Sequence, residues 1–242
     1  FVSDDGYLLI NCSDSVSLFS EKIRGVLAYL LLISNDLNKS SFELKTKFLS
    51  KIFKTHLKSL GKNTRNIDDW VQDVLLHEYW WRKKNYFSLE TAIKVVNKEF
   101  DFYSSSPYCF TNYAWYKNLN FNLNNHILGE YYKIQHNFFD MRSSIGYLSK
   151  ENNKNLNNLV NKACNSIYNF NSNNLDVLIS SLSNLKMFIL KNKSYISSVN
   201  YLNQVISILK DYKKKKKLDL KKLEKIKTWW GYATQYIVFK KK

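Results

Sequence analysis

The stretch Asp5-Gly6-Tyr7-Leu8-Leu9-Ile10-Asn11 decides the fold class, because a short apolar run directly follows a turn-like Asp-Asp-Gly sequence. Its length and polar borders are typical of a buried β-strand. The segment Phe100-Asp-Phe-Tyr-Ser104 alternates apolar and polar residues like a second strand, which Pro107 ends. A third segment, Gln235-Tyr-Ile-Val-Phe-Lys240, is β-branched and aromatic. The sequence therefore predicts about three strands.

Helical patterns fill most of the chain between these strands. Apolar residues repeat with a period near 3.6 over residues 23–31 and again over residues 42–60. Ser40 followed three residues later by Glu43 predicts a capping box at the start of the second of these helices. Ser88 predicts the N-cap of a later helix.

Three more apolar stripes lie within residues 113–227, a region rich in Asn and Lys. They begin at Leu156, Leu175 and Val199, and each is wide enough to bury against a neighbouring helix. We therefore expect three antiparallel helices in this region. The five-lysine run that follows them is expected to be a solvated helix end.

The chain carries a formal net charge of +17, which on its own favours an anionic partner such as nucleic acid. Its basic residues comprise 33 Lys and four Arg, and it also holds 29 Asn. Arginine supplies the bidentate contacts that nucleic-acid readers use, so its scarcity weakens that interpretation. Lys, Asn, Tyr and Phe are residues that AT-rich coding DNA favours. We interpret the charge mainly as solvated surface and keep nucleic acid as a less favoured partner.

The sequence predicts a cytoplasmic protein without membrane association. The longest nearly apolar run, residues 26–33, is far shorter than the 18 or more residues that a membrane span needs. Cys12, Cys109 and Cys164 lie far apart and form no C-x-x-C pair, which favours buried free thiols in a reducing compartment. No Cys, His and carboxylate spacing matches a metal site, so none is predicted.

Three separated pieces resemble the C-terminal half of class I S-adenosylmethionine-dependent methyltransferases. The first, Asp5-Gly-Tyr-Leu-Leu-Ile10, is similar to strand five of that family. The second is Asp73-Val-Leu-Leu-His77, followed by the helix that Ser88 begins and by the strand at residue 100. The third, Trp230-Gly-Tyr-Ala-Thr-Gln-Tyr-Ile-Val-Phe239, is similar to the closing strand seven.

The resemblance implies a particular sheet. In this family strand seven lies between strands five and six and runs antiparallel to both. The expected fold class is therefore α/β and mainly helical, with a partial Rossmann-like sheet and a long α-helical insertion. Residues 1–112 and the closing strand at 228–242 would form the α/β part, and residues 113–227 would form the insertion.

The resemblance also implies S-adenosylmethionine as the cofactor of a full-length protein. In the family a glycine-rich loop and residues after strands one to four hold this cofactor, and all of them precede strand five. No G-x-G occurs among the six glycines, and Phe1 stands where a full-length product would have Met. We therefore expect a C-terminal part that is inactive alone, carries no cofactor-binding residue and acts on an unknown methyl acceptor.

The predicted catalytic pair lies in the aromatic-rich segment 70–81. If this segment is helical, Asp73 and His77 share one of its faces, and His77 could act as a general base or bind a metal. Glu78 stands where the family often has Pro. Family members often place substrate contacts after strand six, which implies three substrate-binding residues: Asn112, Trp115 and Tyr116.

Two non-enzymatic alternatives remain. The basic and aromatic cluster Trp80-Trp-Arg-Lys-Lys84 could stack nucleic-acid bases, and such binding would weaken steeply with salt. Alternatively, the helices of residues 113–227 could form an adaptor that binds another protein.

Overall fold

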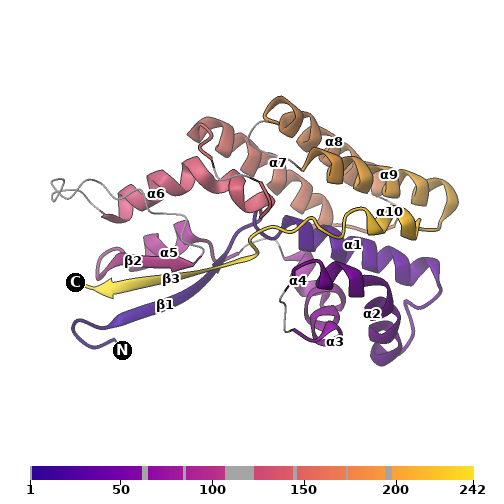
Figure 1. The fold of residues 1–242 in the computed structure, drawn as a ribbon, viewed down its shortest axis with the longest axis horizontal. Helices are drawn as coiled ribbons and strands as arrows, with labels where there is room; N and C mark the ends of the chain where they lie inside the picture. The colour runs from indigo at the N-terminus through magenta and orange to yellow at the C-terminus, as the bar shows by residue number, and fades with distance from the viewer. Residues whose placement is uncertain are drawn as a thin grey trace.

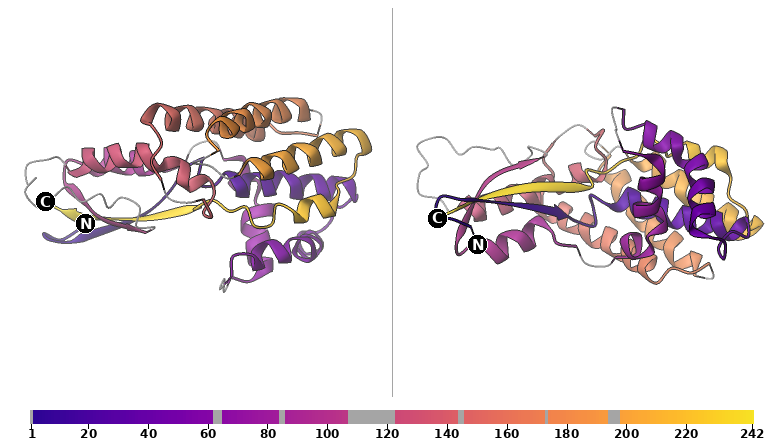
Figure 2. Two further views of the ribbon diagram at one scale, coloured as in Figure 1. Left: turned by 45° about the horizontal axis from the view of Figure 1, so that its top comes forward. Right: turned by 90° about the horizontal axis from the view of Figure 1, so that it is seen from below.

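A computed structural model describes residues 2–61, 65–83, 86–106, 123–143, 146–172, 174–193 and 198–242. It shows an elongated α/β molecule with a small sheet at one end and a mostly helical body at the other (Figure 1). Both described ends of the chain lie at the sheet end, as Figure 2 shows from two further sides.

The sheet has three strands in the order β1-β3-β2, formed by β1 (Tyr7–Ser13), β3 (Thr234–Lys241) and β2 (Phe100–Ser106). The central strand β3 is antiparallel to both neighbours, so β1 and β2 are parallel to each other. The three predicted strands are thus confirmed, including the antiparallel last one. Tyr103 is an extra residue in β2 at an irregularity between Phe102 and Ser104.

Helices cover one face of this sheet. α5 (Leu89–Val96) contacts β1 and β2, and α6 (Leu123–Ile134) contacts β2. The buried Asn124 of α6 binds the backbone of β2 with both ends of its side-chain amide, 2.9 Å from the Phe100 carbonyl and 2.8 Å from the Phe102 N–H. The opposite face carries exposed apolar side chains, namely Tyr7, Leu9, Tyr103 and Tyr236.

Two long helices of the helical body come early in the chain, α1 (Phe19–Ser34) and α2 (Phe42–Lys58). Ser41, and not the predicted Ser40, caps α2, because the Ser41 hydroxyl accepts from the Leu44 N–H at 3.3 Å. Glu43 binds Lys47 one turn later and does not complete a capping box. The predicted cap at Ser88 is confirmed, since its hydroxyl accepts from the N–H of Thr91 in the first turn of α5.

The aromatic-rich segment 70–81 is largely helical. It includes the end of α3 (Ile67–Trp70), a π-helix η1 (Val71–Leu76) and most of α4 (Glu78–Arg82). Its apolar residues pack against α1, where Gly25 leaves room for the buried ring of Trp81. A Cβ atom on Gly25 would lie 2.3 Å from that ring, so this crossing requires glycine.

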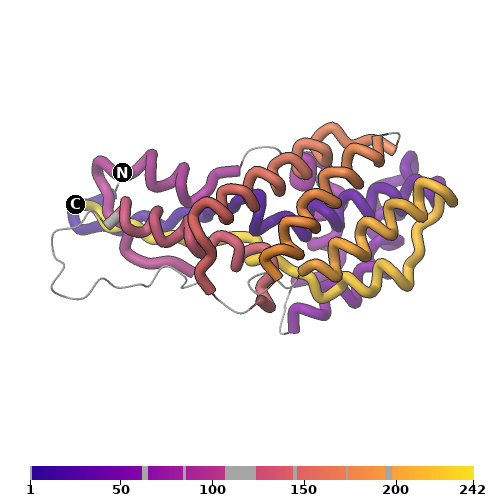
Figure 3. Tube along the Cα trace, turned by 90° about the horizontal axis from the view of Figure 1, so that it is seen from above, coloured from indigo at the N-terminus to yellow at the C-terminus, as the bar shows by residue number. Residues whose placement is uncertain are grey.

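The predicted antiparallel helices are α7 (Lys150–Tyr168), α8 (Leu175–Lys191) and α9 (Val199–Lys215), which lie side by side in Figure 3. α6 is followed by the 3-10 helix η2 (Gln135–Phe139), and α9 by the short α10 (Leu220–Glu224). Lys216 ends α9 with a left-handed backbone, φ 54°. The buried residues of α7, α8 and α9 belong to one hydrophobic cluster with those of α1 and α2. The predicted domain boundaries at residues 112 and 227 stay a prediction.

Arg24 of α1 binds the segment that connects α10 to β3. Its side chain is fully buried and donates to the Ser20 carbonyl and to three carbonyls after α10, those of Ile226, Lys227 and Trp229. Its Nε also donates to His56 Nδ1 at 3.3 Å, and its guanidinium lies 3.8 Å from the centre of the Trp230 ring. Arg24 therefore satisfies backbone acceptors that would otherwise be buried without donors.

Among the described residues, none of the helices is long and apolar enough to cross a membrane. Cys12 and Cys164 are buried free thiols, as predicted, and Cys109 lies outside the described residues.

Candidate functional site

The carboxyl end of β1 opens onto a polar pocket of about 320 Å³. Asp14 and Ser15 follow the strand directly, and further walls come from the start of α5 and from α6 and α7. β1 and β2 run in the same direction on either side of the antiparallel β3, and ligands of open α/β sheets bind outside such carboxyl strand ends. The pocket lies at the carboxyl end of β1, and no described residue of β2 lines it. The lining residues are Asp14, Ser15, Tyr86, Ser88, Glu90, Thr91, Tyr131, Tyr132, Gln135, Asn157 and Asn161.

Asp14 is the centre of this pocket, with only 6% of its surface exposed. One carboxylate oxygen accepts from the Ser17 N–H at 2.7 Å, and the other accepts from the Tyr131 hydroxyl. Gln135 in turn donates to the Tyr131 hydroxyl at 3.1 Å. Because Tyr131 and Gln135 are four residues apart, one face of α6 and η2 delivers both side chains.

Burial controls the protonation of this network. It raises the pKa of Asp14 above its ordinary value, although the hydrogen bonds from Tyr131 and Ser17 act in the opposite direction. Burial, and then the charge of Asp14, raises the pKa of Tyr131 well above its ordinary value. Tyr131 is therefore a phenol at neutral pH and donates a proton in its bond to Asp14.

The thiols near the pocket are not suited to nucleophilic chemistry. Burial raises the pKa of Cys12 to about 12, with a contribution from Asp14, and burial raises that of Cys164 to about 11. Because the thiolate is the reactive form, both groups are inert at neutral pH. Lys22 lies behind the pocket wall, where its ammonium donates to the Trp81 carbonyl at 3.0 Å and lies 4.9 Å from the centre of the Tyr86 ring.

The pocket is rich in hydroxyl and amide groups, and the part of its lining that the structure describes contains no Lys or Arg. Its second acid, Glu90, is half-buried and binds Lys94 at 2.6 Å. Hydrogen bonding to Lys94 lowers the pKa of Glu90, so the lining contains one half-buried and paired carboxylate and one buried acid. Such a lining is suited to an uncharged polar molecule with several hydroxyl groups.

The predicted catalytic pair lies elsewhere. Asp73 is exposed and forms an ion pair with Arg65, and His77 is an exposed residue with non-helical backbone at the end of η1. The ring of His77 lies near Tyr79, with centroids 6.0 Å apart, and neither residue of the pair lines the Asp14 pocket. A catalytic role for this pair stays a prediction.

The predicted substrate-binding residues lie outside the described residues. Asn112, Trp115 and Tyr116 belong to residues 107–122, which follow the carboxyl end of β2. Their role also stays a prediction.

Sequence reasoning missed the Asp14, Tyr131 and Gln135 network. Ser13-Asp-Ser-Val-Ser17 contains a usable signal, because Asp14 lies within three residues of the end of the predicted strand at Asn11. Tyr131 comes 117 residues later, so its partnership with Asp14 follows only from the tertiary fold.

The described residues do not fit S-adenosylmethionine as a binding partner on their own. The turn after β1 is serine-rich, and none of the described glycines forms a glycine-rich turn after a strand. An adenosyl group needs such a close backbone approach, so the described residues do not form a site for the cofactor. The described residues also contain no group of three or more His, Cys, Asp or Glu side chains that could hold a metal ion.

Comparison of the chain with protein-family models, with curated proteins and with solved structures finds no match.

Proposed function

We propose that this chain is the substrate-side part of a class I S-adenosylmethionine-dependent methyltransferase, with the Asp14 pocket as part of the methyl-acceptor site. The observation that carries this proposal is the strand arrangement, in which β3 lies between β1 and β2 and is antiparallel to both. This is the arrangement that the resemblance implies for strands five, seven and six. Support also comes from the pocket at the carboxyl end of β1.

The proposed roles follow from the chemistry of the pocket. S-adenosylmethionine, held by residues outside this chain, would supply the methyl group. Asp14 would accept a hydrogen bond and then the proton from the acceptor hydroxyl, since its raised pKa makes it a stronger base than a solvated aspartate. Tyr131 would hold the carboxylate in place. The helices of residues 113–227 would act as a lid on the acceptor side.

The acceptor in this proposal is an uncharged, hydroxyl-bearing small molecule in the cytoplasm. Among the described residues that line the pocket there is no Lys or Arg, which argues against a phosphate-bearing acceptor despite the net charge of +17. The buried free thiols Cys12 and Cys164 support a reducing compartment.

The reading frame upstream of Phe1 tests the proposal. A predicted strand followed by a glycine-rich turn, with an acidic residue about 20 residues further on, is the expected result. A stop codon or a start codon directly before Phe1 would overturn the proposal.

A basic nucleic-acid-binding surface is the alternative function, and the lysines at the end of α9 favour it. Two ion pairs weaken this alternative, because Lys213 at the end of α9 binds Asp176, and Lys222 in α10 binds Asp211. The alternative predicts binding to duplex or single-stranded nucleic acid that weakens steeply between low and physiological salt. A flat salt response, or no binding at low salt, would exclude it.

A further inference from the structure

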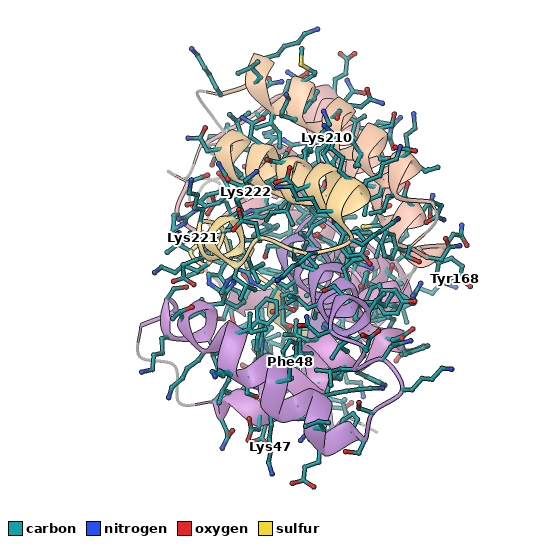
Figure 4. All side chains as sticks on the ribbon, turned by 90° about the vertical axis from the view of Figure 1, so that its right-hand side faces the viewer. Lys47, Phe48, Tyr168, Lys210, Lys221 and Lys222 are labelled. Atoms are coloured by element: carbon teal, nitrogen blue, oxygen red, sulfur yellow. The ribbon has the colours of Figure 1, made fainter. Side chains whose placement is uncertain are left out.

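A second cavity lies in the helical body, away from the Asp14 pocket. It is a groove of about 470 Å³ between the end of α1, one face of α2 and α10, and it shares no lining residue with the Asp14 pocket. Figure 4 views this end of the molecule, with Phe48 on the side of α2 toward the other helices and Lys47 at the outer side. Its apolar lining consists of Leu31, Phe48, Ile52, Leu218, Leu220 and Leu223.

The floor of the groove carries no charge. His56 is fully buried there, and its Nδ1 accepts from Arg24 Nε, so the neutral ring carries its proton on Nε2. Burial and the neighbouring charges of Arg24 and Lys227 lower the pKa of His56 to about 2, and the backbone of Leu223 acts in the opposite direction. The ring therefore stays neutral at physiological pH and does not oppose the entry of an apolar group.

The mouth of the groove is positively charged. Lys51 and Lys217 both line it, both are exposed, and neither forms an ion pair within the described part of the chain. The only acidic lining residue is Glu224, which binds Lys227 at 2.7 Å and accepts from the Thr55 hydroxyl at 2.7 Å. Two free ammonium groups thus border an apolar cavity whose single carboxylate is already paired.

We propose that this groove binds a small amphipathic monoanion, a carboxylate with one unbranched alkyl chain. The alkyl chain would lie against Phe48, Ile52 and Leu223, and the carboxylate would bind Lys51 and Lys217 at the mouth. The cavity volume lies within the range of small-molecule sites, about 300–1,000 Å³. The proposal does not depend on the proposed methyltransferase function, because the two cavities have separate linings.

Calorimetric titration of the whole chain with decanoate tests the proposal, with decanol and decylammonium as comparison ligands. Saturable binding of decanoate that is tighter than that of decanol, with decylammonium weakest, is the expected order. No saturable binding of decanoate up to about 1 mM, or equal binding of all three, would overturn the proposal.

Two variant pairs locate the site. The double variant Lys51→Ala with Lys217→Ala is expected to weaken decanoate binding about tenfold, whereas the control Lys54→Ala with Lys210→Ala removes the same charge outside the groove and stays within about twofold. Ile52→Trp should fill the groove and abolish binding, and Lys54→Trp on the exposed side of α2 should not. Equal effects within either pair would contradict the assignment, and circular dichroism confirms that each variant is folded.

Discussion

Helix α1 is associated with two buried polar clusters that differ in what their groups contact. Arg24, within the helix, is fully buried and donates to four backbone carbonyls and to His56. Asp14, just before the helix, holds Tyr131 and the Ser17 N–H but lines a pocket of hydroxyl and amide groups. Burial of charge therefore marks structure in the first case and a candidate site in the second.

The largest expected loss of stability comes from removing the Arg24 side chain. Arg24→Met would leave the carbonyls of Ser20, Ile226, Lys227 and Trp229 without this donor, so we expect a loss of about 3–5 kcal/mol in the free energy of unfolding. Urea denaturation measures this loss. Arg65→Met is the control, because Arg65 is part-exposed and should cost less than about 1 kcal/mol. Equal losses of unfolding free energy in the two variants would show that the buried bonds of Arg24 do not stabilise the fold.

The next effect concerns the turn that holds Asp14. A Cβ atom on Gly231 would lie 2.1 Å from the Ser17 carbonyl oxygen and 2.8 Å from that of Phe138, so Gly231→Ala should cost about 1–3 kcal/mol. Gly129→Ala in α6 is the matched control, since a Cβ there meets nothing within 4 Å and improves helix propensity by up to about 1 kcal/mol. Thermal denaturation of the two variants should shift in opposite directions. A stable Gly231→Ala variant would contradict this packing.

Tyr131→Phe tests the Asp14 network itself. It would remove the donor to one carboxylate oxygen and should lower stability by about 1–2 kcal/mol, because a buried acceptor loses its partner. Tyr168→Phe, at a residue that is 49% exposed, should change stability by less than about 0.5 kcal/mol. Chemical denaturation that finds no difference between the two variants would remove Tyr131 from the network.

The effect that is smallest at neutral pH, and that grows as the pH falls, is a pH dependence of stability from His56, which accepts a hydrogen bond from Arg24. The folded-state pKa of His56 is lowered to about 2, so its contribution to stability is complete above the unfolded pKa near 6.5 and is lost as the pH falls. Relative to His56→Gln, the wild-type chain should lose up to about 1.4 kcal/mol per pH unit below pH 6.5. His136, with a pKa lowered to about 4, is present in both proteins and cancels. Parallel stability curves between pH 7 and pH 4.5 would contradict the burial of His56.

Local patterns in the sequence predicted the elements and the cap at Ser88, but not the polar contacts between distant elements. The helices with stripes beginning at Leu156, Leu175 and Val199 follow from periodicity, because side-chain spacing determines which face is buried. The strands β1 and β3 follow from a short apolar run with polar borders and from β-branched and aromatic composition. The cap shifted from Ser40 to Ser41, since neighbouring serines offer the same chemistry and the backbone decides between them. The sequence predicted a shared helix face for His77 and Asp73. In the structure the helix breaks at His77, and its side chain is exposed. The Asp14 network required contacts across more than 100 residues, which no local pattern encodes.

Methyl transfer by the product of the entire reading frame tests the central claim most directly. With labelled S-adenosylmethionine and hydroxyl-bearing small molecules from the source cells, Asp14→Asn is expected to lower kcat/KM by about 100-fold or more, since a general base is lost while the fold is kept. Asp73→Asn, which changes an exposed carboxylate outside the pocket, should stay within about twofold of the wild type. A large loss in Asp73→Asn with full activity in Asp14→Asn would contradict the account and return the site to His77 and Asp73.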